Sequence, residues 1–508
     1  MQKVAPLAQL RADRALAVEV DGQKIILLRD GDAVRAYSAV CPHAGGPLEE
    51  GGICQGRIIC PWHKGAFRVC DGALLEPPPL DDLTRYPARV EGQDVYVDVT
   101  PAPPQAVRPQ MDERTFVIVG AGAAGGTAVA ALREFGFGGR ILLIGREPGP
   151  PFDRTALSKF VVAGEMKPSE TPPLRPEEFY AEHRIERLEA EVARFDARRR
   201  ELVLTDGRRI AFERALLAPG GEPKIPEISG VDKRGVHVLR SREDAASILA
   251  DLRPGARAIV LGSSFIGLET AACLRAQKAS VTVVSPEPVP FARQFGERIG
   301  RSIRALHEAH GVLFVDNAKA AQIEGNGRVS GLLLHDGRRL PADLIVVGVG
   351  VRPATRFVRG VEPGEDGGLP VDATLRLAEG IYAAGDVAAF PLTPGGEQTR
   401  IEHWRVAQQQ ARVAAANMLD RRVPCVVTPF FWTYHYGNNF EYLGRAERWD
   451  EEIVFGDVDK QDFLALLMQG ESVAAVVSCG RQRISSVLSE RMRTTLLREE
   501  AMQIVTAS

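Results

Sequence analysis

Four metal-ligand side chains near the start of the chain constrain its fold most strongly. Cys41-Pro-His43 is followed, after sixteen intervening residues, by Cys60-Pro-Trp-His63. Two such loops from one β-rich domain can hold a [2Fe–2S] cluster, with two cysteines on one iron and two histidines on the other. Because neutral imidazoles replace two thiolates, such a cluster has a raised potential. We therefore expect Cys41, His43, Cys60 and His63 to be cluster ligands.

A zinc site or unrelated structural roles would account for this spacing less well. A Cys2His2 zinc finger would require C-x2–4-C and a helical H-x3–5-H, and scattered structural roles would have to place four residues together by chance. The chain has 7 cysteines, an odd and small number that excludes a secreted disulfide scaffold. Cys54 and Cys70, which lie outside the ligand set, are expected to be buried apolar side chains.

The length and net charge of the chain limit the classes of protein to which it can belong. A chain of 508 residues is long enough for three or four domains. Its 63 basic and 66 acidic residues give a net charge of −3, which argues against a nucleic-acid binder that works by bulk electrostatics. Glycine is in excess, with 50 residues or about 10% against a usual ~7%.

Neither a signal peptide nor a membrane span is expected. Arg11, Asp13 and Arg14 interrupt the stretch where a signal peptide needs an apolar core. The longest weakly polar run, 116–132, is short and rich in glycine, whereas a span needs roughly 20 apolar residues. We expect a soluble, cytoplasmic protein without an integral membrane segment.

The first hundred residues have the sequence pattern of an all-β domain. Short apolar runs alternate with DG and GG turns about every ten residues, as in Lys24–Leu28, Arg57–Cys60 and Asp94–Val99. Residues 101–113 are proline-rich and poor in apolar anchors, which is typical of a linker.

After Arg114 the pattern changes to strand–glycine loop–helix–strand, with strands expected at Phe116–Val119 and Arg140–Ile144. The loop carries Gly120, Gly122 and Gly125. The first glycine permits a tight turn, the second lets the backbone approach a pyrophosphate, and the third allows helix and strand to pack closely. At the end of the second strand Glu147, with Arg146 beside it, is positioned to meet ribose hydroxyls.

A second dinucleotide loop follows the expected strand Ala258–Leu261 and reads Gly262-Ser-Ser264-Phe-Ile-Gly267-Leu-Glu269. Ser264 replaces the middle glycine. After the next strand, Ser280–Val284, comes Ser285 where an acid favours NADH, and Glu287 stands two residues later. No basic cluster suited to NADPH replaces the acid, so NADH is preferred by a narrow margin.

Two dinucleotide loops predict two dinucleotides, FAD in one domain and NAD(P)H in the other. The expected fold is multidomain: an N-terminal all-β domain, two α/β Rossmann-like domains and a C-terminal α+β domain with strands Ile453–Phe455 and Val473–Val477 and a helix Ser485–Glu499. The expected boundaries are 1–100 for the cluster domain, 101–113 for the linker, 114–235 with 352–420 for a discontinuous FAD domain, 236–351 for NAD(P)H, and 421–508 for the last domain.

The chain resembles known families over nearly its whole length. The ligand loops, with Pro47–Gly52 and Lys64–Phe67 beside them, resemble Rieske ferredoxins. From Arg114 onward the chain resembles FAD-dependent pyridine-nucleotide oxidoreductases of the ferredoxin reductase branch, and as a whole it resembles Rieske-containing, apoptosis-inducing factor-like flavoproteins. The segments that carry the second likeness are Pro150–Lys159, Leu216–Pro226, Gly348–Pro353, Ile381–Ala388, Ile401–Met418 and Pro429–Thr433.

The resemblance assigns roles to individual residues. Arg154 and Lys159 would contact the flavin, with Lys159 paired to Glu269 as the catalytic pair, and Asp386 would hold the ribityl chain. The remaining assignments are Trp404 and Trp432 beside the isoalloxazine or the nicotinamide, and Gly350 at the cofactor. Taken without the resemblance, Asp386 could be a turn residue, Lys159 a surface charge and Trp432 plain core.

Departures from the family patterns also carry information. Gly46 and Trp62 stand where high-potential Rieske proteins have a disulfide, which implies the low-potential ferredoxin type. Pro219 replaces a threonine common in relatives, and Ser285 leaves the choice of nicotinamide open. After Gly120 only Cys273, Cys425 and Cys479 remain, without the spacing of a redox-active pair, so dithiol chemistry is not expected.

The expected function is an NAD(P)H-dependent reductase. NAD(P)H would give hydride to the flavin, electrons would pass singly to the Rieske cluster, and an unknown acceptor protein or oxygenase would receive them. The alternatives are a reductase for a separate ferredoxin, and an NADH-responsive redox-sensing or interaction flavoprotein with slow turnover. A nitrite reductase component is disfavoured, because no further cysteine cluster is present. A monomer or homodimer is expected.

Overall fold

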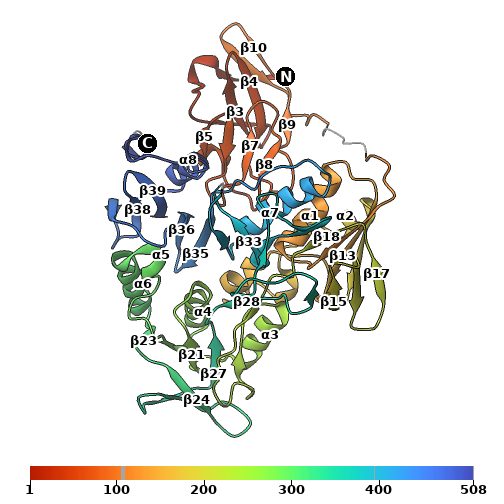
Figure 1. Ribbon diagram of the computed structural model, residues 1–508. Helices are drawn as coiled ribbons and strands as arrows, with labels where there is room; N and C mark the ends of the chain where they lie inside the picture. Colours follow the sequence, from red (N-terminus) through yellow and green to blue (C-terminus); the bar gives the residue numbers. More distant parts are fainter. Residues whose placement is uncertain (104–108, 394, 507–508) are drawn as a thin grey trace.

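The computed structural model describes residues 1–508 except 104–108, 394 and 507–508 (Figure 1). Short antiparallel strands build the N-terminal β region, which forms the upper part of the molecule in Figure 1. One sheet joins β2 (Leu16–Val20), β3 (Gln23–Asp30), β4 (Ala33–Ser38) and β9 (Arg85–Tyr86); a second joins β5 (Gly52–Cys54), β6 (Arg57–Ile59), β7 (Ala66–Arg68) and β8 (Leu74–Glu76); a third joins β1 (Gln2–Pro6), β11 (Asp94–Val97) and β10 (Ala88–Glu91).

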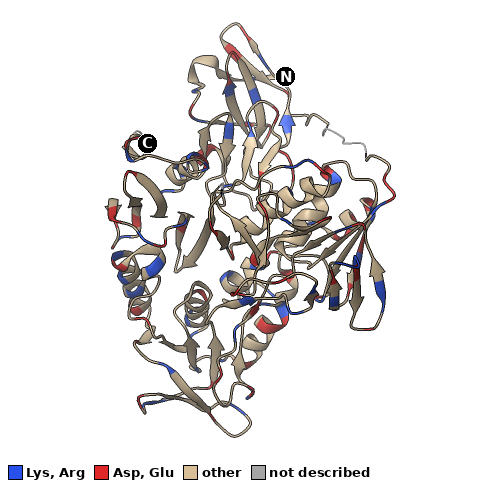
Figure 2. Ribbon diagram, viewed as in Figure 1, with Lys and Arg blue, Asp and Glu red and all other residues tan. Residues whose placement is uncertain are grey.

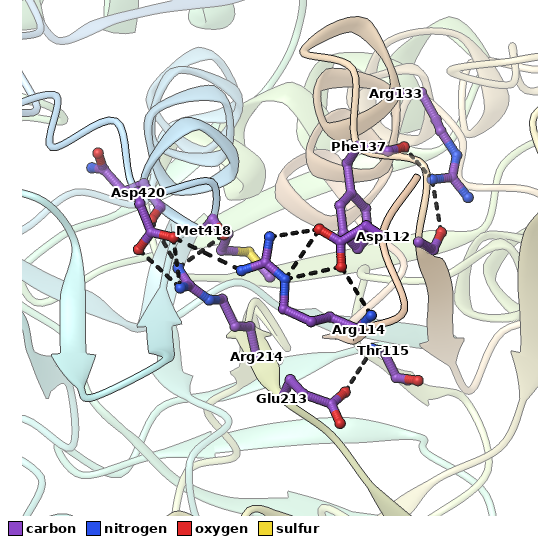
Figure 3. A network of polar contacts seen from close by, with 11 residues as sticks. Asp112, Arg114, Thr115, Arg133, Phe137, Glu213, Arg214, Met418 and Asp420 are labelled. Atoms are coloured by element: carbon purple, nitrogen blue, oxygen red, sulfur yellow. Dashed lines mark hydrogen bonds and ion pairs between the residues drawn. The ribbon is translucent and has the colours of Figure 1, made fainter. Parts of the chain in front are cut away.

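The predicted linker, 101–113, lies partly outside the described residues, because 104–108 are not described. Beyond it, a polar network fixes the point where the chain enters the α/β part (Figure 3). Arg114 pairs with Asp112 at 2.6 Å, and Arg214 pairs with Asp420 at 2.8 Å. Arg114 also approaches Asp420 at 3.8 Å, so the network ties this entry point to a residue that lies after the last long helix of the α/β part.

Strands from both sides of residue 300 share the first α/β sheet. Its order is β14 (Ile185–Glu189), β13 (Arg140–Gly145), β12 (Thr115–Val119), β18 (Arg214–Leu217), β32 (Ile381–Ala383) and β31 (Arg376–Ala378). Helix α1 (Ala123–Glu134) packs along α7 (Trp404–Asn417), and the small alanine and glycine residues of α1 permit this close approach. Residues separated by more than 270 positions therefore form one layer of this fold.

The second parallel sheet lies in the lower part of Figure 1. Its order is β20 (Val236–His237), β27 (Leu344–Val347), β21 (Arg257–Leu261), β22 (Ser280–Val284) and β23 (Leu313–Val315), and its helices are α3 (Arg242–Asp251), α4 (Phe265–Ala276), α5 (Ala292–Phe295) and α6 (Glu297–Ala309). Smaller antiparallel or mixed sheets flank the two large ones: β17 (Arg209–Ala211), β16 (Glu201–Leu204), β15 (Val192–Asp196) and β29 (Val358–Arg359); β19 (Gly221–Pro223) and β28 (Val351–Pro353); β24 (Ala320–Glu324), β25 (Gly331–Leu334) and β26 (Arg339–Pro341); β30 (Leu369–Pro370), β33 (Ala388–Pro391) and β34 (Gln398–Arg400).

The C-terminal segment forms one antiparallel sheet followed by helices. The order is β35 (Phe430–His435), β36 (Asn438–Gly444), β39 (Ser472–Cys479), β38 (Asp462–Gln469) and β37 (Glu451–Asp457). The single helix predicted over Ser485–Glu499 is wrong: two helices, α8 (Gln482–Arg491) and α9 (Arg498–Thr506), stand in its place. The chain between them turns back onto the sheet, where Val473 N donates to Leu496 O at 2.9 Å. This tertiary pairing interrupts the helical pattern.

Lys and Arg are interleaved with Asp and Glu along the ribbon (Figure 2), in keeping with the nearly balanced charge. Within the described residues, no helix has the length and apolar character needed to cross a membrane.

The prediction that Cys54 and Cys70 are buried is wrong, because Cys54 is half-buried and Cys70 is exposed. Cys54 is the last residue of β5, and Cys70 lies in the turn that follows β7.

Candidate functional site

A cavity of about 800 Å³ opens between the two large α/β sheets and the C-terminal sheet. This volume lies within the usual range for a small-molecule or cofactor site, ~300–1,000 Å³. Its walls bring together many residues singled out in the sequence: Gly120, Gly122, Glu147, Arg154, Lys159, Glu269, Gly350, Asp386, Trp404 and Trp432. Gly125, Gly262, Gly267, Ser285 and Glu287 are described residues that do not line it.

The first glycine loop connects β12 to α1, and its three glycines differ in how much space a side chain would have. A Cβ on Gly125 would lie 1.8 Å from Gly120 O, and one on Gly120 would lie 2.0 Å from Ala218 O. Gly120 also has φ +109°, a backbone conformation that favours glycine. By contrast, nothing lies within 4 Å of a Cβ on Gly122. The protein itself requires Gly120 and Gly125, whereas Gly122 presents open backbone to the cavity.

A chain of ion pairs lines the wall beyond this loop. Glu147 accepts from Arg154 at 2.6 Å, and Arg154 donates to the carbonyl oxygen of Arg240 at 2.5 Å. Arg240 in turn pairs with Asp386 at 2.8 Å. Burial lowers the pKa of Arg154, although Glu147 opposes that shift. Arg240 was not singled out in the sequence, and its position before the capping box of α3 is a helix-start signal rather than a binding motif.

Lys159 and Glu269 meet inside the cavity. Lys159 lies on a π-helical turn, Leu157–Val161, a local geometry that is often found at functional sites. Its Nζ is 2.8 Å from Glu269 Oε1. Glu269, on α4, is 2% exposed and also accepts from Ser158 Oγ at 2.5 Å and from Thr433 Oγ1 at 2.8 Å. The carboxylate is therefore fully hydrogen-bonded despite its burial.

The second glycine loop tolerates Ser264 because its side chain turns inward. Ser264 Oγ donates to Gly348 O at 2.7 Å and accepts from Gly267 N at 3.2 Å, and it thereby caps α4. Outside the cavity, Ser285 Oγ contacts Ser263 Oγ at 2.8 Å and Glu287 Oε2 at 3.1 Å. The buried Ser285 thus links the loop to Glu287, the acid two positions further on.

The two ligand loops of the N-terminal region have the same hydrogen-bond design. Cys41 N donates to Gly46 O at 2.9 Å, and Cys60 N donates to Gly65 O at 2.8 Å. Each loop thus folds back beside its cysteine, and the two histidines, both half-buried, face each other. A Cβ on Gly46 would lie 2.8 Å from Cys60 Sγ, so this position has no room for a side chain.

The four ligand candidates form a thiol pair and an imidazole pair. Nδ1 of His43 and Nδ1 of His63 face each other at 3.1 Å. The thiols of Cys41 and Cys60 hydrogen-bond each other, and this contact raises the pKa of Cys41 and lowers the pKa of Cys60 to about 7. In the part of the chain that the structure describes, no three His, Cys, Asp or Glu side chains group around one metal ion. Two pairs on two metal atoms are what a mixed Cys/His [2Fe–2S] cluster requires.

Comparison with known proteins identifies the two parts of the chain. Residues 1–87 match the Rieske [2Fe-2S] domain, and residues 114–411 match the pyridine nucleotide-disulphide oxidoreductase family. The chain belongs to the pyridine nucleotide-disulphide oxidoreductase family. The resemblance predicted from the motifs is confirmed, and these families imply FAD, NAD(P)H and a [2Fe–2S] cluster.

Relatives of this oxidoreductase match either nearly the whole chain or about three quarters of it. It is 35% identical to apoptosis-inducing factor 3 of Homo sapiens over 497 residues, covering 93% of this chain and 80% of the relative. It is 36% identical to the biphenyl dioxygenase system ferredoxin–NAD(+) reductase component of Paraburkholderia xenovorans (strain LB400), covering 75% and 93%. The covalent putidaredoxin reductase–putidaredoxin complex matches with a TM-score of 0.72 at 28% identity, covering 78% of this chain and 98% of that one. The protein is an oxidoreductase.

The residues present fit FAD in the cavity and a [2Fe–2S] cluster at the two ligand loops. Besides the open backbone at Gly122, the cavity has buried side-chain nitrogens without a hydrogen-bond partner in the described chain, His403 Nδ1 and Trp404 Nε1. Burial lowers the pKa of His403 to about 4. All seven cysteines are unpaired, and Cys273 lies buried against Ser158 O at 3.0 Å. No redox-active cysteine pair stands beside the cavity among the described residues, despite the family's name.

The Rieske region is seated against this cavity. The ring of His63 lies 4.3 Å from that of Trp432, centroid to centroid, and the ammonium of Lys159 lies 5.7 Å from the Trp432 ring. Trp432 is thus in contact with a cluster-ligand candidate while it lines the cavity. Neither the motif spacing nor the resemblance predicted this contact, because His63 and Trp432 are 369 residues apart.

Buried charges hold the two regions together. Lys64 Nζ pairs with Glu441 Oε1 at 2.7 Å and donates to Pro61 O at 2.5 Å. Arg405, at the start of α7, donates to Lys64 O and Pro77 O, both at 2.9 Å. Glu76 accepts from Gln409 at 2.6 Å and pairs with Arg493. The contacts come from the second N-terminal sheet on one side and from α7, β36 and the C-terminal helices on the other.

Proposed function

We propose that this protein transfers electrons from NAD(P)H through FAD to the Rieske [2Fe–2S] cluster on the same chain, and from there to an external acceptor protein. The contact between His63 and Trp432 carries the proposal. It joins a predicted cluster ligand to the wall of the cavity that contains the first glycine loop and the Lys159–Glu269 pair. FAD supplies the conversion of a two-electron hydride into single electrons.

The chain's own residues hold the cofactors in place under this proposal. Cys41, His43, Cys60 and His63 would hold the cluster. Gly120 and Gly122 would receive the FAD pyrophosphate at the N-terminus of α1, where the helix dipole favours an anion, and Gly125 would let the helix pack closely against the loop. Glu147 would meet the ribose, and Asp386, held by Arg240, would meet the ribityl chain. Lys159 would stand at the isoalloxazine with Glu269 as its counter-ion, next to Trp404 and Trp432.

We propose that NADH is the preferred donor. The hydrogen bonds from Ser263 to Ser285 and from Ser285 to Glu287 place a carboxylate near the second glycine loop, although the residue directly after β22 is a serine. A carboxylate there can accept from ribose hydroxyls and would repel a 2′-phosphate. Gly262, Gly267 and Gly350 would allow the protein backbone to approach the dinucleotide closely.

We also propose four structural units: the Rieske unit 1–100, the FAD unit 114–235 with 352–420, the NAD(P)H unit 236–351, and a C-terminal unit 421–508. The last unit has two tasks in this scheme. It closes the cavity with Phe431 and Trp432, and it receives the Rieske unit through Glu441. An antiparallel sheet suits both tasks, because alternate side chains on its strands point to opposite faces.

Anaerobic stopped-flow spectroscopy tests the proposed electron path. The holoenzyme is mixed with NADH or NADPH while the flavin and cluster absorption bands are followed separately. We expect the flavin band to change first and the cluster band to bleach afterwards. In the Cys41→Ser variant, which should lack the cluster, the flavin band should still change at the wild-type rate. A wild-type cluster that stays oxidised beside a fully reduced flavin would contradict the proposal.

The same variant distinguishes the nearest alternative. If the protein instead served a separate ferredoxin directly from its flavin, Cys41→Ser would reduce that ferredoxin as fast as the wild type. The Rieske region covers the cavity at Trp432, so we expect the variant to be slow in this assay.

A further inference from the structure

A buried line of polar side chains leaves the cavity on the side away from the Rieske region. It begins at Glu269, whose Oε1 accepts from Thr433 Oγ1 at 2.8 Å. Thr433 Oγ1 lies 3.0 Å from His435 Nε2, and His435 Nδ1 lies 3.2 Å from His307 Nε2. The line thus passes from α4 through β35 to α6, and each distance is that of a hydrogen bond.

These side chains lie in a largely apolar setting. Thr433, His435 and His307 are 0% exposed. Aromatic rings surround the imidazoles: Phe291 and Phe440 lie 6.2 and 6.0 Å from the ring of His435, and Phe314 lies 6.3 Å from that of His307. Burial of polar groups is costly unless they are hydrogen-bonded. An apolar core would serve packing better, so the connected line calls for another role.

The atoms along the line allow two complete hydrogen-bond arrangements. In one, His307 Nε2–H donates to His435 Nδ1, His435 Nε2–H donates to Thr433 Oγ1, and the Thr433 hydroxyl donates to the Glu269 carboxylate. In the other, every donor and acceptor is reversed, and His307 carries its proton on Nδ1. The reversed arrangement holds one proton more, because the Glu269 carboxyl is then protonated and donates to Thr433. It becomes the first arrangement when each proton moves one position along the line and the Nδ1 proton of His307 leaves, which is possible because each imidazole and hydroxyl both donates and accepts.

The outer end of the line is buried, but an exposed histidine lies near it. His307 Nδ1 and the Tyr436 hydroxyl are buried and have no hydrogen-bond partner among the described residues. The two rings lie 5.0 Å apart, and Tyr436 stacks on the exposed His310 at 3.7 Å. The unpartnered Nδ1 of His307, whose ring contacts a tyrosine that stacks on an exposed histidine, is the position from which a proton would pass to solvent.

The reaction leaves a proton to be removed. Oxidation of one NAD(P)H by two one-electron acceptors gives NAD(P)+, two reduced acceptors and one proton, and the hydride enters the protein inside the cavity. We propose that Glu269, Thr433, His435 and His307 form the path by which this proton reaches solvent. Glu269 would accept it, the Thr433 hydroxyl and the two imidazoles would pass it on, and His307 Nδ1 would release it. This inference rests on the proposed function for the source of the proton.

The protonation state of the imidazoles supports such a path. Burial lowers the pKa of His435 to about 3 and lowers that of His307 well below its ordinary value of 6.5. Lys159 reinforces the shift at His435, and the neighbouring imidazoles of His435 and His310 reinforce the shift at His307. At neutral pH each ring is therefore uncharged, with one N–H and one free lone pair, which is the form that can both donate and accept.

Timing of proton release tests the path. Holoenzyme pre-reduced anaerobically with one equivalent of NADH is mixed with ferricyanide in weak buffer containing a pH-indicator dye, and the dye is followed together with the flavin and cluster bands. In Thr433→Val, which keeps the shape but lacks the hydroxyl, we expect proton appearance to slow on the order of 10²-fold. Thr433→Ser should release the proton as fast as the wild type. His237→Gln, at a histidine remote from the line, is the matched control.

A second measurement does not depend on turnover. In ¹⁵N-histidine-labelled protein without NAD(P)H, the ring nitrogens of His307 and His435 should show neutral, hydrogen-bonded forms, and Thr433→Val should shift Nε2 of His435 but leave His237 unchanged. If Thr433→Val does not fold, His435→Gln takes its place in the dye experiment, and in the NMR experiment the ring nitrogens of His307 then serve as the readout.

The outcomes separate the two proposals. If NADH does not bleach the wild-type cluster, the proposed function fails, whatever the dye shows. If the cluster bleaches but Thr433→Val releases its proton at the wild-type rate, the proton path is wrong. It is equally wrong if Thr433→Ser is as slow as Thr433→Val, or if the His435 resonance does not respond to loss of the hydroxyl.

Discussion

The ammonium of Lys64 lies 2.7 Å from a carboxylate oxygen of Glu441, and the two side chains are 0% and 1% exposed. Lys64 directly follows the cluster-ligand candidate His63, whereas Glu441 lies on β36 of the C-terminal sheet. Ser485 Oγ also donates to Glu441, at 2.5 Å. A buried pair with its remaining oxygen satisfied holds the Rieske region in one orientation over the cavity. This geometry supports a docked relay rather than a swinging one.

Removal of the charge on Glu441 should loosen this contact. In Glu441→Gln the Lys64 ammonium stays buried without its counter-ion, which typically costs ~3–5 kcal/mol. We expect denaturant unfolding, followed by the cluster band, to shift to lower concentration by a corresponding amount. The exposed pair Lys3–Asp94 provides the control, since Asp94→Asn should change stability by less than about 1 kcal/mol. Equal effects of the two variants would mean that the buried pair does not hold the Rieske region.

Trp432 should matter for electron transfer to the cluster and much less for reduction of the flavin. Trp432→Leu removes the aromatic contact with His63, so we expect slower bleaching of the cluster band after NADH addition. Trp432→Phe should be intermediate, because it keeps a ring at this position. Trp449→Leu, at a tryptophan outside the cavity, serves as the control. A Trp432→Leu enzyme that bleaches its cluster at the wild-type rate would remove this residue from the path.

Alanine substitutions at two glycines should separate folding from FAD binding. Gly122→Ala places a methyl group in open space, so we expect the protein to fold but to hold FAD about tenfold more weakly, or ~1.4 kcal/mol. Gly125→Ala places it 1.8 Å from Gly120 O, so we expect ~1–3 kcal/mol or more of lost stability. Circular dichroism melting and bound FAD, measured on the same samples, distinguish the two effects. Full FAD content in a stable Gly122→Ala protein would argue against pyrophosphate contact there.

Glu287 should govern the choice of nicotinamide. Loss of its charge in Glu287→Gln removes a repulsion that a 2′-phosphate would meet, so the NADH-to-NADPH ratio of kcat/KM should fall. Because Glu287 is exposed, we expect a change of about tenfold, equivalent to ~1.4 kcal/mol. Glu297→Gln, an exposed acid on the neighbouring helix, is the control. An unchanged ratio in Glu287→Gln would assign specificity to other residues.

The stability of the folded protein should decrease as the pH is lowered, because His435 is buried in its neutral form. Its pKa in the folded protein is lowered from the ordinary value of 6.5 to about 3, so below pH 6.5 the unfolded chain binds a proton that the folded chain does not. Stability from this group is therefore complete above pH 6.5 and declines toward pH 3, with a loss of about 2 kcal/mol at pH 5. We expect His435→Gln to lose about that much less than the wild type between pH 7.5 and 5 in chemical unfolding.

The exposed His335→Gln variant controls for removal of an imidazole as such. Parallel pH profiles for the wild type and His435→Gln would show that the buried imidazole takes up its proton as readily as the unfolded chain does.

Short-range patterns in the sequence identify the cofactor loops because each loop is built from neighbouring residues. Gly120 and Gly125 must be glycine because they approach each other and the adjacent strand within one turn, and Cys41 and His43 share a loop closed by its own backbone. The same local logic leads to Gly262 and Gly267. It fails for Ser485–Glu499, where a pairing of Val473 with Leu496 breaks a helix that the local pattern predicts.

Tertiary structure alone decides which of these parts work together. His63 meets Trp432, Lys64 meets Glu441, and Glu269 is joined through Thr433 and His435 to His307, and these connections bridge positions far apart in the chain. A lysine, a threonine or a histidine is chemically ambiguous until its neighbours are known. The amino-acid sequence by itself determined the kinds of cofactor and the loops that would hold them. Their mutual placement, and the proton path beside them, depends on long-range packing that removes water from these polar groups and leaves only one another as hydrogen-bond partners.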